Sequence, residues 1–155
     1  MKHTIHVIVN EQPYTLEVLS HETLLRMLRE RLGLTGAKRA CETGECGACS
    51  VQVNNLVVNA CTMLAVEADG VEITTVEGLA TPEGLHPLQK AFLDHHGTQC
   101  GFCAPGFLMA SAALLKQVSR PDENAIRAAL AGNLCRCTGY ADIISSVQAA
   151  SRARR

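Results

Sequence analysis

Eight cysteines constrain this chain more than any other feature of its sequence. They form two sets of four, one set in each half of the 155 residues. The first set is Cys41, Cys46, Cys49 and Cys61, and the second is Cys100, Cys103, Cys135 and Cys137. Four thiolates are the number that encloses a tetrahedral zinc ion or an iron–sulfur cluster. The count therefore predicts one metal centre in each half.

The first set has the spacing C-x4-C-x2-C, followed by eleven residues and then Cys61. This is the spacing of plant-type [2Fe–2S] proteins. Four thiolates must converge on two irons, so the loop has to curl tightly. Gly44 and Gly47 permit positive φ angles and close approach of the backbone to the cluster. The stretch CETGECGAC (41–49) therefore predicts a [2Fe–2S] site, with zinc as the alternative.

The second set is C-x2-C, 31 residues, and then C-x-C. This spacing is less specific, because zinc could use it and a C-x2-C pair can also be a redox pair. Disulfides are disfavoured, since a bridge between Cys135 and Cys137 would need a strained small ring. No export signal is visible at the N-terminus, so the expected compartment is the cytoplasm, where free thiols persist.

Composition excludes several classes of function. The formal net charge is -1, so no strong field favours nucleic acid or an anionic membrane. Aromatic residues make up only 3% of the chain and Trp is absent, which argues against base-stacking platforms. No apolar run reaches the roughly 18 residues that would span a bilayer. We therefore expect no nucleic acid partner and no membrane span.

The first half reads as strands around one helix. Alternating apolar residues predict a hairpin of strands over 4–10 and 14–19. Leucines at helical spacing predict a helix over 24–32 that ends at Gly33. Three further strands are expected at 50–53, 56–59 and 71–75. This pattern indicates a small α+β domain over residues 1–76.

The second half reads as four short helices, which indicates a small bundle over residues 85–155. Their expected ranges are 87–95, 107–117, 124–131 and 141–153. Residues 77–84, rich in turn formers, are expected to link the two domains. Two of the helices directly follow a pair of cysteines. The partial positive charge of a helix N-terminus stabilises thiolates, so these two turns are suited to hold one cluster together.

Three motifs carry a resemblance to a known family. CETGECGAC, TQCGFCAPG and GNLCRCTGY, in this order, resemble the iron–sulfur (small) subunit of the molybdenum hydroxylases, the xanthine oxidase family. That family includes aldehyde oxidoreductases, carbon monoxide dehydrogenase and 4-hydroxybenzoyl-CoA reductase. The resemblance extends from the first strand to about residue 150. One departure is Ala40, where the family usually has Gly before the first cysteine.

The resemblance implies a β-grasp, ferredoxin-like domain followed by a four-helix-bundle domain, each with one [2Fe–2S] cluster. It implies that each set of four cysteines holds one of the two clusters. Gln99 and Cys137 match family positions that contact the pterin. Without the resemblance, Gln99 would be read as capping the 100–103 turn. Arg136 could be a solvated charge or a partner for the cluster or the pterin.

The resemblance also implies partners. No phosphate-binding fingerprint such as G-x-G-x-x-G is present, and the chain ends at SRARR (151–155). The expected partners are therefore a medium FAD-binding subunit plus a large molybdopterin-binding subunit, in a heterotrimer or a dimer of heterotrimers. Substrate chemistry is expected at molybdenum in the large subunit, with no catalytic residue in this chain.

Two functions remain at this point. The first is an electron-transfer subunit that relays single electrons between molybdenum and FAD through two [2Fe–2S] clusters. The second is a free-standing ferredoxin-like carrier or a zinc-stabilised interaction module. The second cysteine motif with Gln99 favours the first, because a simple carrier does not need it.

Overall fold

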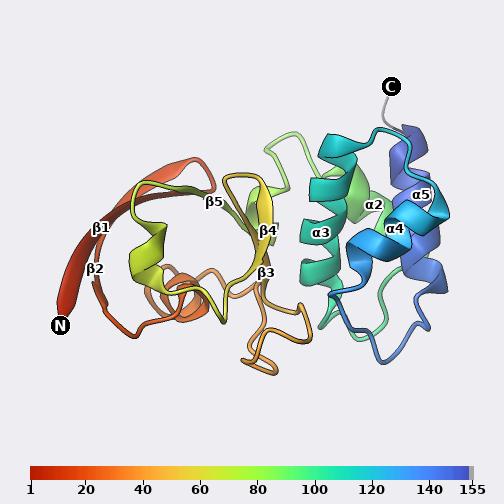
Figure 1. Ribbon diagram of the computed structural model, residues 1–155. Helices are drawn as coiled ribbons and strands as arrows, with labels where there is room; N and C mark the ends of the chain where they lie inside the picture. Colours follow the sequence, from red (N-terminus) through yellow and green to blue (C-terminus); the bar gives the residue numbers. More distant parts are fainter. Residues whose placement is uncertain (154–155) are drawn as a thin grey trace.

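The computed structural model describes residues 1–153. Residues 154 and 155, the last two of the predicted second domain, lie outside the described residues. The chain has a mixed α+β fold, in which strands dominate the first half and helices the second (Figure 1). No helix within residues 1–153 is long and apolar enough to cross a membrane.

The predicted hairpin is present at the start of the chain. Strands β1 (Lys2–Val9) and β2 (Gln12–Leu19) pair antiparallel. Asn10 and Glu11 make the turn, with φ angles of 50° and 66°. Both central residues of a type I′ turn need such positive φ, and this turn matches the twist of the two strands.

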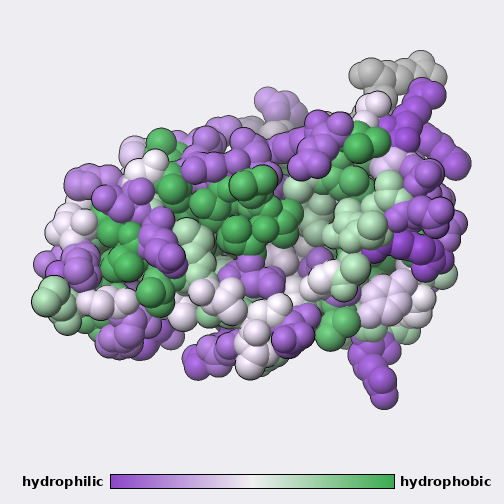
Figure 2. Space-filling model, viewed as in Figure 1, coloured by the Kyte–Doolittle hydropathy of each residue, from purple (hydrophilic) through white to green (hydrophobic). Residues whose placement is uncertain are grey.

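Three more strands complete one sheet in the described chain: β3 (Ser50–Val53), β4 (Leu56–Asn59) and β5 (Glu72–Thr74). The strand order is β2-β1-β5-β3-β4. Strand β5 is parallel to β1, in the register Val9↔Ile73, and antiparallel to β3. Strand β4 forms an edge of the sheet and exposes Leu56 and Val57. Figure 2 shows an apolar patch near the middle of the face that it draws, over the region of β3 and β4 in Figure 1.

The predicted helix at 24–32 is only partly α-helical. Thr23 caps α1 (Leu24–Arg26), and a π-helical segment, η1 (Met27–Arg31), follows it directly. The Leu32 amide donates to the Met27 carbonyl, five residues back, at 3.3 Å. This wider turn leaves Met27 as well as Leu28 buried against the sheet.

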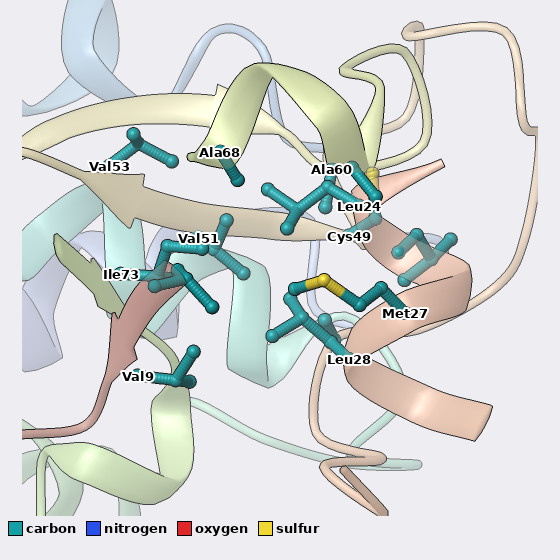
Figure 3. Close-up of a cluster of buried hydrophobic side chains, with 14 of the residues drawn as sticks. Val9, Leu24, Met27, Leu28, Cys49, Val51, Val53, Ala60, Ala68 and Ile73 are labelled. Carbon is teal, nitrogen blue, oxygen red and sulfur yellow. The ribbon is translucent and has the colours of Figure 1, made fainter. Parts of the chain in front are cut away.

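The first core lies between this helical segment and one face of the sheet (Figure 3). Leu24, Met27 and Leu28 come from the helix side, while Val9, Val51 and Ile73 come from the strands. Burying such side chains contributes about 1.5–3 kcal/mol each, which makes this core the main stabilising feature of the first half.

Four helices make up the second half of the described chain: α2 (Pro87–Asp94), α3 (Ala104–Gln117), α4 (Glu123–Leu130) and α5 (Ala141–Ala153). Helix α3 begins three residues before the predicted 107, because Pro105 is accepted in a first helical turn. The helices enclose a second core around Phe92, Phe107, Ile126 and Ile143.

The two halves pack directly against one another, with α3 lying beside β3 and β4 (Figure 1). Every residue of β3 is buried because both of its faces are covered. Val51 and Val53 belong to the first core, whereas the Gln52 Nε2 donates to the Met109 carbonyl of α3 at 3.0 Å. The Lys116 ammonium donates to the Gln52 Oε1 at 3.0 Å. The predicted division of the chain at residues 77–84 stays a prediction.

Candidate iron–sulfur sites

The first cysteine loop runs between η1 and β3 and has no regular secondary structure. Cys41 and Cys46 are half-buried, and Cys49 and Cys61 are buried. The chain reverses direction sharply here, since Gly44 and Gly47 have φ angles of +82° and +66°. This conformation lets the loop fold back without a clash from Cβ atoms.

Backbone groups of this loop act on its thiols. The Thr43 amide donates to the Cys41 Sγ at 3.4 Å. Hydrogen bonds from Thr43 and Cys46 lower the pKa of Cys41 to about 5. Burial has the opposite effect on Cys49, and raises the pKa of that thiol to about 12. The loop therefore offers donors to sulfur at its exposed end and an apolar wall at its buried end, both of which tune a bound cluster.

The second set brings together cysteines from two distant turns. Cys100 and Cys103 directly precede α3, and Cys135 and Cys137 precede α5. The Sγ atoms of Cys100 and Cys137 lie 3.7 Å apart although 37 positions separate them in the sequence. The two turns that each place a pair of cysteines before a helix therefore face one another in the fold.

All four thiols of the second set line one cavity of about 420 Å³. Its lining residues are Cys100, Phe102, Cys103, Leu134, Cys135, Arg136, Cys137 and Tyr140. Phe102 and Leu134 are 47% and 55% exposed, which is high for large apolar side chains. The cavity is thus a cysteine-lined opening with an apolar rim on the surface of the helical half.

The environments of these thiols differ. Burial, followed by the neighbouring Cys135 thiol, raises the pKa of Cys103 to about 12. Burial also opposes ionisation of Cys135, but hydrogen bonds from Thr138, Cys137 and Cys103 together outweigh it and lower the pKa of Cys135. The Thr138 amide and hydroxyl lie 3.5 and 3.2 Å from the Cys135 Sγ. A hydrogen bond to Cys100 raises the pKa of Cys137.

Chemistry of the donor set shows that the residues fit two clusters. All eight cysteines are free thiols. The first set comes from the loop before β3 and the turn after β4, and the second comes from the turns before α3 and α5. Within residues 1–153 no three His, Cys, Asp or Glu side chains converge closely enough to hold a single metal ion. A [2Fe–2S] cluster shares its four thiolates between two irons, so it does not require three ligands at one point.

Other predicted residues lie around the second set. Gln99 is exposed and precedes Cys100, but it does not line the cavity, whereas Arg136 does.

Two hydrogen bonds near the second set were not expected from the sequence. The Tyr140 hydroxyl accepts a hydrogen bond from the Cys135 amide at 3.1 Å, and its ring packs edge-on against Phe107, with centroids 6.1 Å apart. Asn133 is 5% exposed and bonds to the first cysteine loop. The only sequence feature that points to Asn133 is its place just before Cys135 and Cys137, which resembles the place of Gln99 just before Cys100 and Cys103.

Comparisons with known proteins match both halves of the chain to iron–sulfur domains. Residues 7–79 match the family described as a 2Fe-2S iron-sulfur cluster binding domain, and residues 75–148 match the [2Fe-2S] binding domain family. Two iron–sulfur domains in one chain define the class of protein.

Several relatives identify the family more closely. The chain is 45% identical to the aldehyde oxidoreductase iron-sulfur-binding subunit PaoA of Escherichia coli K12, over 92% of this chain and 69% of that protein. It is 46% identical to the nicotine 6-hydroxylase small subunit of Paenarthrobacter nicotinovorans, over 92% of this chain and 86% of that one. Among solved structures, quinoline 2-oxidoreductase from Pseudomonas putida 86 matches with a TM-score of 0.95 and 40% identity, over 98% of this chain and 95% of that chain.

The chain therefore belongs to the iron–sulfur subunits of the molybdenum hydroxylases, the xanthine oxidase family. This confirms the resemblance carried by the three cysteine motifs. Its relatives are subunits of oxidoreductases, so this chain too is part of an oxidoreductase.

Proposed function

We propose that this chain is the electron-transfer subunit of a molybdopterin-dependent hydroxylase or dehydrogenase. It would relay single electrons between molybdenum and FAD, which a large and a medium subunit would hold. The observation that carries the proposal is the presence of two sets of four free thiols, one at the curled loop before β3 and the turn after β4, and one in a single cavity between two helix starts. A carrier that only shuttles electrons in solution needs one such site.

Each site has its own set of ligands in this proposal. Cys41, Cys46, Cys49 and Cys61 would hold one [2Fe–2S] cluster, with Gly44 and Gly47 shaping the loop. Cys100, Cys103, Cys135 and Cys137 would hold the other. When bound, the clusters supply one-electron oxidation and reduction. The protein supplies amide and hydroxyl donors from Thr43 and Thr138, which stabilise the thiolates and help to set the potentials.

The finer features of the fold support the same reading. A mixed sheet that packs on α1 and η1 supports the predicted β-grasp domain. Helices α2 to α5 around one core support the predicted four-helix bundle. The cytoplasmic location, expected because no export signal is visible in the sequence, stays a prediction.

Exposure of the second site supports a partner at that surface. Gln99 and Cys137 are both exposed, as a contact with the pterin of a large subunit requires. The apolar rim formed by Phe102 and Leu134 is suited to be covered by another chain, because exposed apolar patches mark interaction sites. A heterotrimer, or a dimer of heterotrimers, is the assembly that we propose.

Anaerobic purification of the tagged chain from its native host tests the proposal. We expect two larger chains, FAD and molybdenum to elute with it, and a visible absorption that dithionite bleaches. Cys46→Ser and Cys103→Ser should each remove about half of the iron, and each variant is the control for the other. Iron without partner chains would support the free-standing carrier instead, and a colourless protein with zinc would support the interaction module.

A further inference from the structure

The two cysteine loops bond directly to one another, although more than 80 residues of chain separate them. The Leu134 amide donates to the Cys46 carbonyl oxygen at 3.0 Å. The Asn133 Nδ2 donates to the Gly47 carbonyl oxygen at 2.9 Å and lies 3.4 Å from the Ser50 Oγ. Residue 46 and residue 135 each belong to one of the two ligand sets, so this contact joins the loops at their cysteines.

The contact is closely packed. A Cβ atom at Gly47 would stand 2.3 Å from the Gly132 carbonyl oxygen and 2.5 Å from the Asn133 Nδ2. Only a glycine therefore allows the two backbones to approach this far. Asn133 and Ser50 are 5% and 4% exposed, so water does not compete for their hydrogen bonds. A buried amide bonded in this way holds its neighbours in one arrangement.

We infer that Asn133 is a positioning residue that holds the two cysteine loops at a fixed spacing. Its amide anchors the Gly47 carbonyl, and this places the adjacent Cys46 carbonyl opposite the Leu134 amide. The result is a short bonded route from Cys46, across one hydrogen bond, through the backbone of Leu134 to Cys135. The inference rests on the proposed function, because only in an electron-transfer subunit would electrons pass between the two cysteine sets along this route.

Passage of an electron along this route needs no co-reactant. The cluster that one cysteine set would hold would be oxidised by one electron and the cluster of the other set would be reduced by one, so no bond would form or break and no proton would move. The hydrogen bond matters because a bonded route couples the two sites better than a gap between unbonded atoms. Loosening of the loops would therefore slow the transfer without removing either site.

The variant Asn133→Asp tests this inference. It keeps the size of the side chain but replaces the Nδ2 donor with an acceptor that faces the Gly47 carbonyl. Asn124→Asp, on the exposed side of α4, is the matched control. The iron-loaded protein, as purified with its bound chains, is used for two readouts. One is hydrogen exchange at the Leu134 amide, and the other is the rate of electron transfer between the clusters after a reducing pulse.

For Asn133→Asp we expect the iron content of the parent protein, exchange at Leu134 about tenfold faster, and slower transfer between the clusters. Asn124→Asp should match the parent. Unchanged exchange and an unchanged rate in Asn133→Asp would overturn the inference. If that variant does not fold, hydrogen exchange of the parent protein decides. A Leu134 amide that exchanges as fast as an exposed amide contradicts the inference, and one that exchanges slowly supports it. A parent chain without iron would instead contradict the proposed function, while Leu134 exchange still reports on the contact.

Discussion

Gly106 lies so close to Gly47 that a Cβ atom at position 106 would stand 2.3 Å from the Gly47 carbonyl oxygen. Gly106 is in the first turn of α3, and Gly47 is in the first cysteine loop. The two halves of the chain therefore meet backbone to backbone. A side chain at this position would have to push the helix away from the loop.

Gly106→Ala should lower the free energy of unfolding by about 1–3 kcal/mol, the usual cost of overpacking a filled site. The thermal midpoint of the iron-loaded protein should fall by several degrees. Gly132→Ala is the control, because a Cβ atom there would meet nothing within 4 Å. Equal midpoints for the two variants would show that the close approach of α3 to the loop is not needed for stability.

Gln52 carries the main polar link between the sheet and α3. It is 1% exposed and bonds to both Met109 and Lys116. Gln52→Met keeps the approximate size of the side chain but removes these bonds, and we expect a loss of about 1–2 kcal/mol, measured by thermal unfolding. Asn55→Gly removes another, exposed acceptor of Lys116 and suits the φ angle of 68° at this turn position, so it should change stability by less than about 0.5 kcal/mol. An equal effect of the two variants would contradict the assignment.

Glu22 predicts a specific dependence of stability on pH. Its buried carboxylate accepts from the Arg31 guanidinium at 2.5 and 2.6 Å, and this hydrogen-bonded pair lowers the pKa of Glu22. A lowered pKa means that the folded state binds the ionised form of Glu22 more favourably than the unfolded state does. The pair's contribution to the free energy of unfolding is therefore complete above the ordinary glutamate pKa of about 4.3. It is lost as the pH falls through the lower pKa of the folded state.

Glu22→Gln should therefore cost about 1.5–3 kcal/mol at pH 7, because a hydrogen bond to a charged group is lost. The difference between the variant and the parent should shrink in unfolding experiments as the pH falls below about 4. Glu30→Gln, at an exposed ion pair with Arg26, should change stability by less than about 1 kcal/mol at any pH. A constant difference for Glu22→Gln across this range would show that the pair does not control the titration.

Much of the fold could be predicted because its signals are local. The alternation of Ile5, Val7 and Val9 fixed one face of the first strand, and all three are buried. The predicted start of α3 at residue 107 is too late, because Pro105 and Gly106 are typical of a turn. The reason for a glycine at position 106 is a tertiary contact, because only a residue without a Cβ atom leaves room for the Gly47 carbonyl. The π-helical segment after Arg26 likewise follows from packing against the sheet, which no local pattern reveals.

The grouping of the cysteines into two sets can be predicted from their spacing, but the contact between the two cysteine loops cannot. In the sequence GNLC (132–135), Asn133 looks like an ordinary turn residue. Its role depends on Gly47, 86 positions earlier, which folding brings within 2.9 Å. Tyr140 is similar, because its hydroxyl bonds to the Cys135 amide only in the folded turn.

The most direct test of the central claim is EPR on the anaerobically purified, dithionite-reduced protein, with iron and acid-labile sulfide counted per copy of this chain on the same sample. We expect about four irons and four sulfides for this chain and two distinct [2Fe–2S] signals. About two irons with one signal would limit the claim to the first cysteine set. An intact anaerobic sample without iron would contradict the electron-transfer function altogether.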